Sequence, residues 1–219
     1  MRLKNYKVIL ALAVVVLGFV FWRTHSIEDL KPDGPLSLAA WGGEFAKVKE
    51  YVDKGVVKVN HRDSKNLTGL HCAAAKGHQD IVDYLISKGA DVTLQDGNYN
   101  TPLHYGAAQG NEFIVKALVG KGAKVDVTNK KGETPLYNAI KNIRYNNVEY
   151  LLSKGAKISS EDMALSKDIH EKLSKKDADF YKVMTDLGLG DERRDKDKTI
   201  GDAGWINSKL AAKYPDQKR

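Results

Sequence analysis

Apolar residues recur at helical spacing in pairs of short segments along the middle of the chain. In the second segment of two such pairs, apolar residues fall on one side of a helix. They are Ile81, Val82, Leu85 and Ile86 in one pair, and Ile114, Val115, Leu118 and Val119 in the next. The first segment of each pair is rich in small residues, such as Ala73 and Ala107, which let helices approach closely. The pattern predicts helix-turn-helix units.

These units repeat every 33 residues. Thr68-Gly69-Leu70-His71 is followed by Thr101-Pro102-Leu103-His104 and then by Thr134-Pro135-Leu136-Tyr137. Threonine suits the N-cap of a helix, and proline suits its first position. Gly89, Gly122 and Gly155 keep the same period, where glycine can end a helix in the left-handed conformation. An earlier copy begins at Pro35, offset by 34 residues.

From Asp33 to Ser160 this pattern resembles the ankyrin-repeat family. The resemblance implies an all-α solenoid of helix-turn-helix repeats with β-turn or hairpin connections, at about 33–65, 66–98, 99–131 and 132–160. Ser159 to Asp162 is typical of a helix start. Residues 161–190 are expected to form a helical cap, because solenoids need polar ends. Residues 191–219 are a charged tail, either loosely attached or an extra contact arm.

The fourth repeat departs from the pattern at two positions. Ile143 stands where its neighbours have Gly77 and Gly110, and Asn147 stands where they have apolar residues. We expect the inter-helix turn of this repeat to be reshaped.

Residues 1–26 have the composition of a targeting segment. Residues 8–22 are apolar or glycine throughout, and Arg2, Lys4 and Lys7 precede them. Such a segment is an export signal or a signal anchor that forms an apolar N-terminal helix. The run is short for a membrane span, whereas Phe21 and Trp22 make a poor cleavage site, so both alternatives stay open. The positive-inside rule places the body outside the cytoplasm, in a bacterium in the periplasm, or secreted after cleavage.

Composition removes several other classes of function. The net charge of the 219 residues is +7, but outside residues 1–26 it is only +3. The basic balance is therefore weak support for nucleic-acid binding, and we expect none. A single cysteine excludes an intramolecular disulfide and the common cysteine-based zinc sites.

No residue pattern indicates catalysis. His71 and His104 occupy the histidine position of the repeat, and Tyr137 replaces the third, so we expect hydrogen bonding between neighbouring turns rather than a base or metal ligand. Cys72 lies in the apolar stripe of a first helix and is expected to be buried. Phosphate-binding and nucleophile motifs are absent. We predict a non-enzymatic protein, monomeric on its own, with no metal or cofactor.

The remaining candidate is a protein-binding surface. The resemblance implies a concave face made by the turns and the exposed side of each first helix. Its expected residues are Trp41, Arg62, Ser64, Lys65, Leu67, Lys76, Gln95, Asn98, Asn100, Gln109, Thr128, Lys130, Lys131, Glu133, Lys141 and Asn142. Cations outnumber the single acid in this set, which predicts one protein partner with an acidic patch. Trp41 either anchors that interface or packs under the segment around Ile27 and Leu30.

Three functions fit this organisation. The build resembles small anchored bacterial immunity proteins that neutralise toxic effectors, phospholipases among them, and this is a likeness of fold alone. The alternatives are an adaptor for a resident periplasmic enzyme, such as one guarding against oxidative stress, and a secreted host-interaction factor.

Overall fold

The predicted helix-turn-helix units are present. A computed structural model of the protein describes residues 31–162 and 164–165. The helices come in consecutive pairs: α2 Pro35–Trp41 and α3 Phe45–Asp53, α4 Gly69–Lys76 and α5 Gln79–Ser87, α6 Pro102–Gln109 and α7 Glu112–Gly120, α8 Pro135–Lys141 and α9 Tyr145–Ser153. Within the described residues no strand occurs, and the expected hairpin connections are turns.

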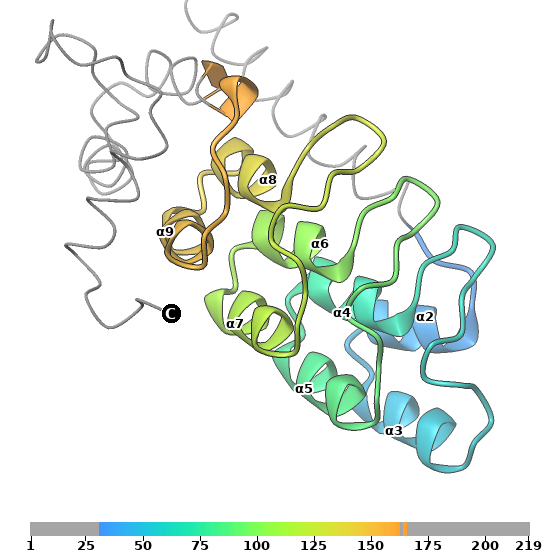
Figure 1. Ribbon diagram of the computed structural model, residues 1–219. Helices are drawn as coiled ribbons and strands as arrows, with labels where there is room; N and C mark the ends of the chain where they lie inside the picture. The colour runs from blue at the N-terminus through green and yellow to red at the C-terminus, as the bar shows by residue number, and fades with distance from the viewer. Residues whose placement is uncertain (1–30, 163, 166–219) are drawn as a thin grey trace, which may run out of the picture.

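The helices form two rows. The first helices of the pairs, α2, α4, α6 and α8, stack in one row, and α3, α5, α7 and α9 stack beside it (Figure 1). The loops that join one pair to the next project beyond the first row (Figure 1). Each unit contacts its sequence neighbours, which is the arrangement of a solenoid.

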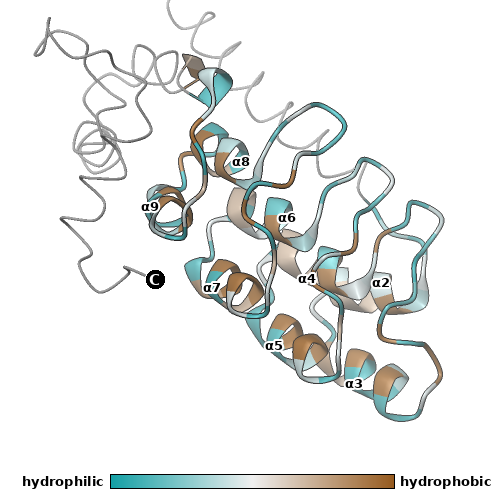
Figure 2. Ribbon diagram, viewed as in Figure 1, coloured by the Kyte–Doolittle hydropathy of each residue, from teal (hydrophilic) through white to brown (hydrophobic). Residues whose placement is uncertain are grey.

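The apolar stripes predicted from the spacing lie between the two rows. Ile81, Leu85, Ile114 and Leu118 are fully buried. Ala73 and Ala107 are buried on the first helices, where small side chains allow close packing. Apolar residues gather on the helices, whereas the projecting loops are mostly hydrophilic (Figure 2).

The first helices begin as the repeated motif predicts. Thr68 and Thr134 are N-caps whose hydroxyl oxygens accept the backbone N–H of the residue three positions on. Pro102 and Pro135 occupy the first turns of α6 and α8. Because N–H groups at this position have no partner within the helix, proline loses no hydrogen bond there.

The expected reshaping of the fourth inter-helix turn is wrong. Gly43, Gly77 and Gly110 have left-handed backbones, with φ of 73°, 80° and 99°, and Ile143 adopts the same conformation at 58°. The hydrogen bond from His78 N to Ala73 O in the second pair (3.0 Å) recurs from Arg144 N to Ala139 O in the fourth (2.9 Å). The fourth turn therefore keeps the backbone of the others, although a β-branched residue is rarely found at positive φ.

Asn147, the other departure, has a specific partner. Its Nδ2 donates to the carbonyls of Gly106 at 3.3 Å and Ala107 at 3.0 Å, near the C-terminal end of α6. Arg144 Nε donates to the Ala108 carbonyl at 3.0 Å. The fourth repeat thus donates hydrogen bonds to carbonyls of the last turn of α6, where helical pairing ends.

The predicted helix start after α9 is confirmed. A helical segment begins at Ser160. Ser159 Oγ accepts the N–H of Asp162 at 3.1 Å, and Asp162 Oδ2 accepts the N–H of Ser159 at 2.8 Å. This reciprocal pair is a capping box. The rest of the predicted cap at 161–190, the tail at 191–219 and the N-terminal segment at 1–26 lie outside the described residues. Across 31–162 and 164–165, no helix has the length and apolarity needed to cross a membrane.

Candidate binding face

Three loops connect the helix pairs, and their ends are built alike. We name these ends the first tip (63–67), the second tip (96–100) and the third tip (129–133). Each opens with a residue whose side-chain Oδ1 accepts two backbone N–H groups, two and four positions on. Asp63 binds Lys65 and Leu67, at 3.0 and 2.8 Å. Asp96 and Asn129 make the same pair of bonds in the other tips. These bonds satisfy the backbone of each turn locally.

Backbone hydrogen bonds join the tips into one edge. Gly97 N donates to Lys65 O at 2.8 Å, and Lys130 N donates to Asn98 O at 2.9 Å. A Cβ added at Gly97 would lie 3.0 Å from Lys65 O, so this approach is tight for any other residue. A preformed edge loses little conformational entropy when a partner binds.

The repeated histidines fasten first helices to the tips of the following repeat, as predicted. His71 Nε2 lies 3.2 Å from the carbonyl oxygen of Asn100, and His104 Nε2 lies 3.1 Å from that of Glu133. In both, Nδ1 faces the backbone N–H of the N-cap threonine. Because an N–H can only donate, Nδ1 must be the acceptor and Nε2 must carry the proton.

Burial keeps these imidazoles neutral. It lowers the pKa of His71 to about 4, and it lowers the pKa of His104 as well. In addition, a protonated Nδ1 would face the backbone N–H of the N-cap threonine, which is also a donor. These histidines are therefore structural near neutral pH.

The second tip carries an additional clamp from α6. Tyr105 donates its hydroxyl proton to Asp96 Oδ2 at 2.5 Å, and Asn100 Nδ2 donates to the Tyr105 oxygen at 3.3 Å. Burial, together with the Asp96 charge, raises the pKa of Tyr105 well above its usual range. The phenol therefore stays protonated and remains a donor to the tip.

The predicted face residues fall into two rows, at the tips and at the C-terminal ends of the first helices. The exposed ones are Arg62, Ser64, Lys65, Asn98, Thr128, Lys130, Lys131 and Asn142. The half-buried ones are Trp41, Lys76, Gln95, Asn100, Gln109, Glu133 and Lys141. The tip hydrogen bonds bring together the residues of the first row.

Leu67 is the exception, and its assignment to the face is wrong. It is only 2% exposed and belongs to the core. Position 67 directly precedes the N-cap of α4, where the loop turns back into the stack. The polar residues at the equivalent positions, Asn100 and Glu133, are half-buried instead.

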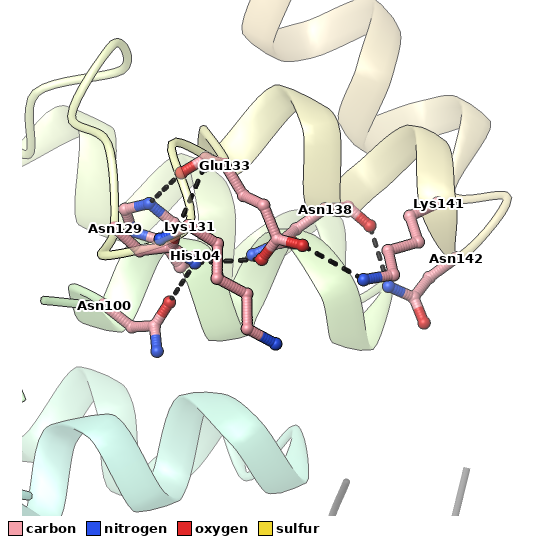
Figure 3. Close-up of polar contacts among 8 residues, drawn as sticks. All are labelled: Asn100, His104, Asn129, Lys131, Glu133, Asn138, Lys141 and Asn142. Carbon is pink, nitrogen blue, oxygen red and sulfur yellow. Dashed lines mark hydrogen bonds and ion pairs between the residues drawn. The ribbon is translucent and has the colours of Figure 1, made fainter. Parts of the chain in front are cut away.

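Several cations of the predicted face already have partners, among them Lys65, whose Nζ donates to the Lys31 carbonyl at 2.9 Å. Lys141 Nζ lies 3.1 Å from Glu133 Oε1 (Figure 3). Burial raises the pKa of Glu133, but bonds from Asn129 and Lys141 outweigh it and lower that pKa overall. Lys76 Nζ lies 4.0 Å from the centre of the Trp41 ring. The exposed positive charge of the face therefore comes from Arg62, Lys65, Lys130 and Lys131.

Trp41 is half-buried and packs against the hydrophobic core. Its carbonyl oxygen lies 3.3 Å from His78 Nε2. Ile27 and Leu30, the alternative partners of this ring, lie outside the described residues. The aliphatic stem and ammonium of Lys76 limit how much of the ring a partner could reach.

Tyr99, the most distinctive side chain of the tips, was not predicted as part of the face. It is 52% exposed, and its φ is 64°. Asn66 and Gly132 hold the same left-handed position in the first and third tips, and both residue types tolerate it. A bulky residue there costs on the order of 1–3 kcal/mol. Lys130 Nζ lies 5.0 Å from the ring centre.

Comparison with known proteins decides the family. A family model described as "Ankyrin repeats (3 copies)" matches residues 13–96 and 93–162. The chain belongs to the ankyrin-repeat family. Ankyrin repeats imply a protein-binding module, which agrees with the projecting tips.

Similar stretches occur in other proteins. The chain is 43% identical over 65 residues to alpha-latrocrustotoxin-Lt1a of Latrodectus tredecimguttatus, covering 30% of this chain and 5% of the toxin. It is 40% identical over 62 residues to palmitoyltransferase AKR1 of Lachancea kluyveri, covering 27% and 8%. With human ankyrin repeat domain-containing protein 49 it shares 36% over 74 residues, covering 32% and 30%. The chain thus spans a minor part of each relative.

The ankyrin body offers few groups for other chemistry. Within residues 31–162 and 164–165, no cluster of three or more His, Cys, Asp or Glu side chains could hold a metal ion. Cys72 is fully buried, as expected, and burial raises the pKa of its thiol far above the usual range. A thiol in that state is a poor nucleophile.

Proposed function

We propose that this ankyrin protein is a non-enzymatic inhibitor that sequesters a toxic effector enzyme on the periplasmic side of the inner membrane. The observation that carries the proposal is the tip edge. Its three turns are joined by backbone hydrogen bonds and present Arg62, Lys65, Lys130 and Lys131 to solvent. Such an edge suits tight binding of an acidic protein surface, since it is preformed and its charges steer encounter.

The sequence of residues 8–22 supports the proposed location. A continuous apolar run after three basic residues is the pattern of an exported or membrane-anchored protein. A small binding module held outside the cytoplasm is placed to occlude an enzyme that arrives there. A phospholipase is one effector of the kind we expect.

Capture followed by an activity assay tests the proposal. The full-length chain, purified in mild detergent, is used to capture proteins from cells grown alone and in contact with competing strains, and each captured protein is assayed with and without it. We expect one hydrolytic effector, bound at a fixed ratio and inhibited. A captured enzyme whose activity is unchanged or raised would favour the adaptor role and contradict sequestration.

Charge reversal at the third tip locates the binding surface. Lys130→Glu/Lys131→Glu should weaken capture at least tenfold and slow association most at low salt, since exposed charges act chiefly on encounter. The matched control is Lys121→Glu/Lys124→Glu, a reversal of two exposed lysines beyond α7. Equal affinity of the tip variant and the wild type would exclude the tips as the binding surface.

A further inference from the structure

Tyr99 is positioned as a specificity-determining contact of the tip edge, and it has no evident role in the fold. Its ring is the large apolar side chain of the tips that lies in solvent, 52% exposed. The contacts that hold the tip use its backbone instead. Its N–H donates to Asp96 O at 3.0 Å, and its carbonyl accepts from Gln95 Nε2 at 3.2 Å. Any residue at position 99 could make these two bonds.

The conformation of Tyr99 is unfavourable for its residue type. The three tips share one left-handed position, with φ of 61° at Asn66, 64° at Tyr99 and 77° at Gly132. Asparagine and glycine occupy that region readily, and tyrosine does not. Strained residues that bury no surface in the core are found where the side chain itself is needed.

The surroundings of Tyr99 indicate what it contacts. Lys130 Nζ lies 5.0 Å from its ring centre, and Lys65 and Lys131 extend the positive charge to both neighbouring tips. The three carboxylates within the tips are held by other hydrogen bonds, and Glu133 also offsets part of the Lys131 charge. Asp63 and Asp96 are buried, and Glu133 pairs with Lys141.

We propose that the second tip recognises an acidic protein segment, with the Tyr99 ring packing against an apolar side chain of that segment while its carboxylates meet Lys130 and Lys131. The inference rests on the proposed function, because it assigns chemistry to the same face. An exposed tyrosine flanked by cations combines the rigid ring and the charge that dominate binding in many interfaces. The bonds from Asp96 and Tyr105 hold the backbone of the second tip, on which Tyr99 stands, before the partner arrives.

A phage-displayed library of random 16-residue peptides is a suitable probe. It is selected in parallel on the full-length chain, on Tyr99→Asn and on Phe113→Asn, and the recovered peptides are then measured by fluorescence anisotropy. Tyr99→Asn keeps a residue that accepts the left-handed backbone. Phe113 is 69% exposed on α7, away from the tips, so its replacement controls for loss of any exposed aromatic ring.

We expect the wild type to select peptides that combine Asp or Glu with an apolar residue. Their affinity should fall at least tenfold in Tyr99→Asn and less than twofold in Phe113→Asn, while the melting temperature of Tyr99→Asn is not lowered. Peptides that bind Tyr99→Asn as tightly, that lack acidic residues, or that fail to be enriched on the wild type over Tyr99→Asn would each overturn the inference.

This outcome is independent of the capture experiment. If the captured protein is not an inhibited effector, sequestration fails while selection of acidic peptides through Tyr99 still stands. If the peptides ignore Tyr99, an inhibited effector can still bind through the lysines alone.

Discussion

In the part of the chain that the structure describes, two bulky residues hold a left-handed backbone, and their surroundings differ. Ile143, in the fourth inter-helix turn, is half-buried and packs against the core. Tyr99, at the second tip, is 52% exposed, and the Lys130 ammonium lies 5.0 Å from its ring centre. Apolar burial offsets the strain at Ile143. The exposed ring of Tyr99 has no comparable burial to offset its strain. We therefore assign Tyr99 to binding and Ile143 to packing.

The turns before the fourth explain why Ile143 is tolerated at its own position. A Cβ added at Gly43, Gly77 or Gly110 would lie 2.7, 2.6 or 2.7 Å from a side chain of the following repeat. Glycine is needed in those turns for its conformation and also for its size.

The largest predicted effect comes from moving isoleucine into a covered turn. Gly110→Ile should lower the free energy of unfolding by about 3 kcal/mol, since backbone strain adds to collision with Arg144. The matched control is Gly89→Ile, where φ is 83° but nothing lies within 4 Å of the added Cβ. It should cost only the strain. Urea unfolding measures both, and equal losses would show that coverage by the next repeat is unimportant.

Acid should lower the stability of the fold through His71. The pKa of His71 is about 4 in the folded state, below its ordinary 6.5, so the unfolded chain takes up the proton first as pH falls. The contribution of His71 to the free energy of unfolding is fully present above pH 6.5. It declines between pH 6.5 and 4, by on the order of 3 kcal/mol. Urea unfolding across this range should show a smaller decline in His71→Gln. An identical pH dependence in that variant would contradict the assignment.

The smallest predicted effect is at Ile143. Asparagine tolerates the left-handed backbone but gives up the apolar contact, so Ile143→Asn should change the free energy of unfolding by less than about 1 kcal/mol. Urea unfolding of this variant beside Tyr99→Asn measures the difference directly. A clear gain in stability at Ile143 would mean that its packing offsets nothing, and the contrast with Tyr99 would disappear.

Much of the fold could be predicted because each repeat carries residues typical of helix starts and helix ends. Threonine and proline at helix starts and glycine after helix ends act locally, and the 33-residue period places each helix beside its counterpart. The fourth turn could not be predicted, because Ile143 contradicts its own backbone preference.

The binding face could be predicted only in part. Polar residues at the tips are exposed as expected, but Leu67 is buried because the loop has already turned towards α4 at that position. Pairing of Lys141 with Glu133 depends on side chains eight positions apart meeting across the turn, which spacing alone does not reveal. Tyr99 could have been found by aligning positions 66, 99 and 132, where a tyrosine stands between an asparagine and a glycine.

Tyr99, on our proposal, serves binding and lowers the free energy of unfolding. The most direct measurement is the free energy of unfolding of the full-length Tyr99→Asn variant, compared with the wild type in urea at pH 7. The account predicts a gain of about 1 kcal/mol, because asparagine relieves the left-handed strain and the exposed ring contributes little to the core. A loss of stability of similar size would contradict it, since the ring would then be serving the fold.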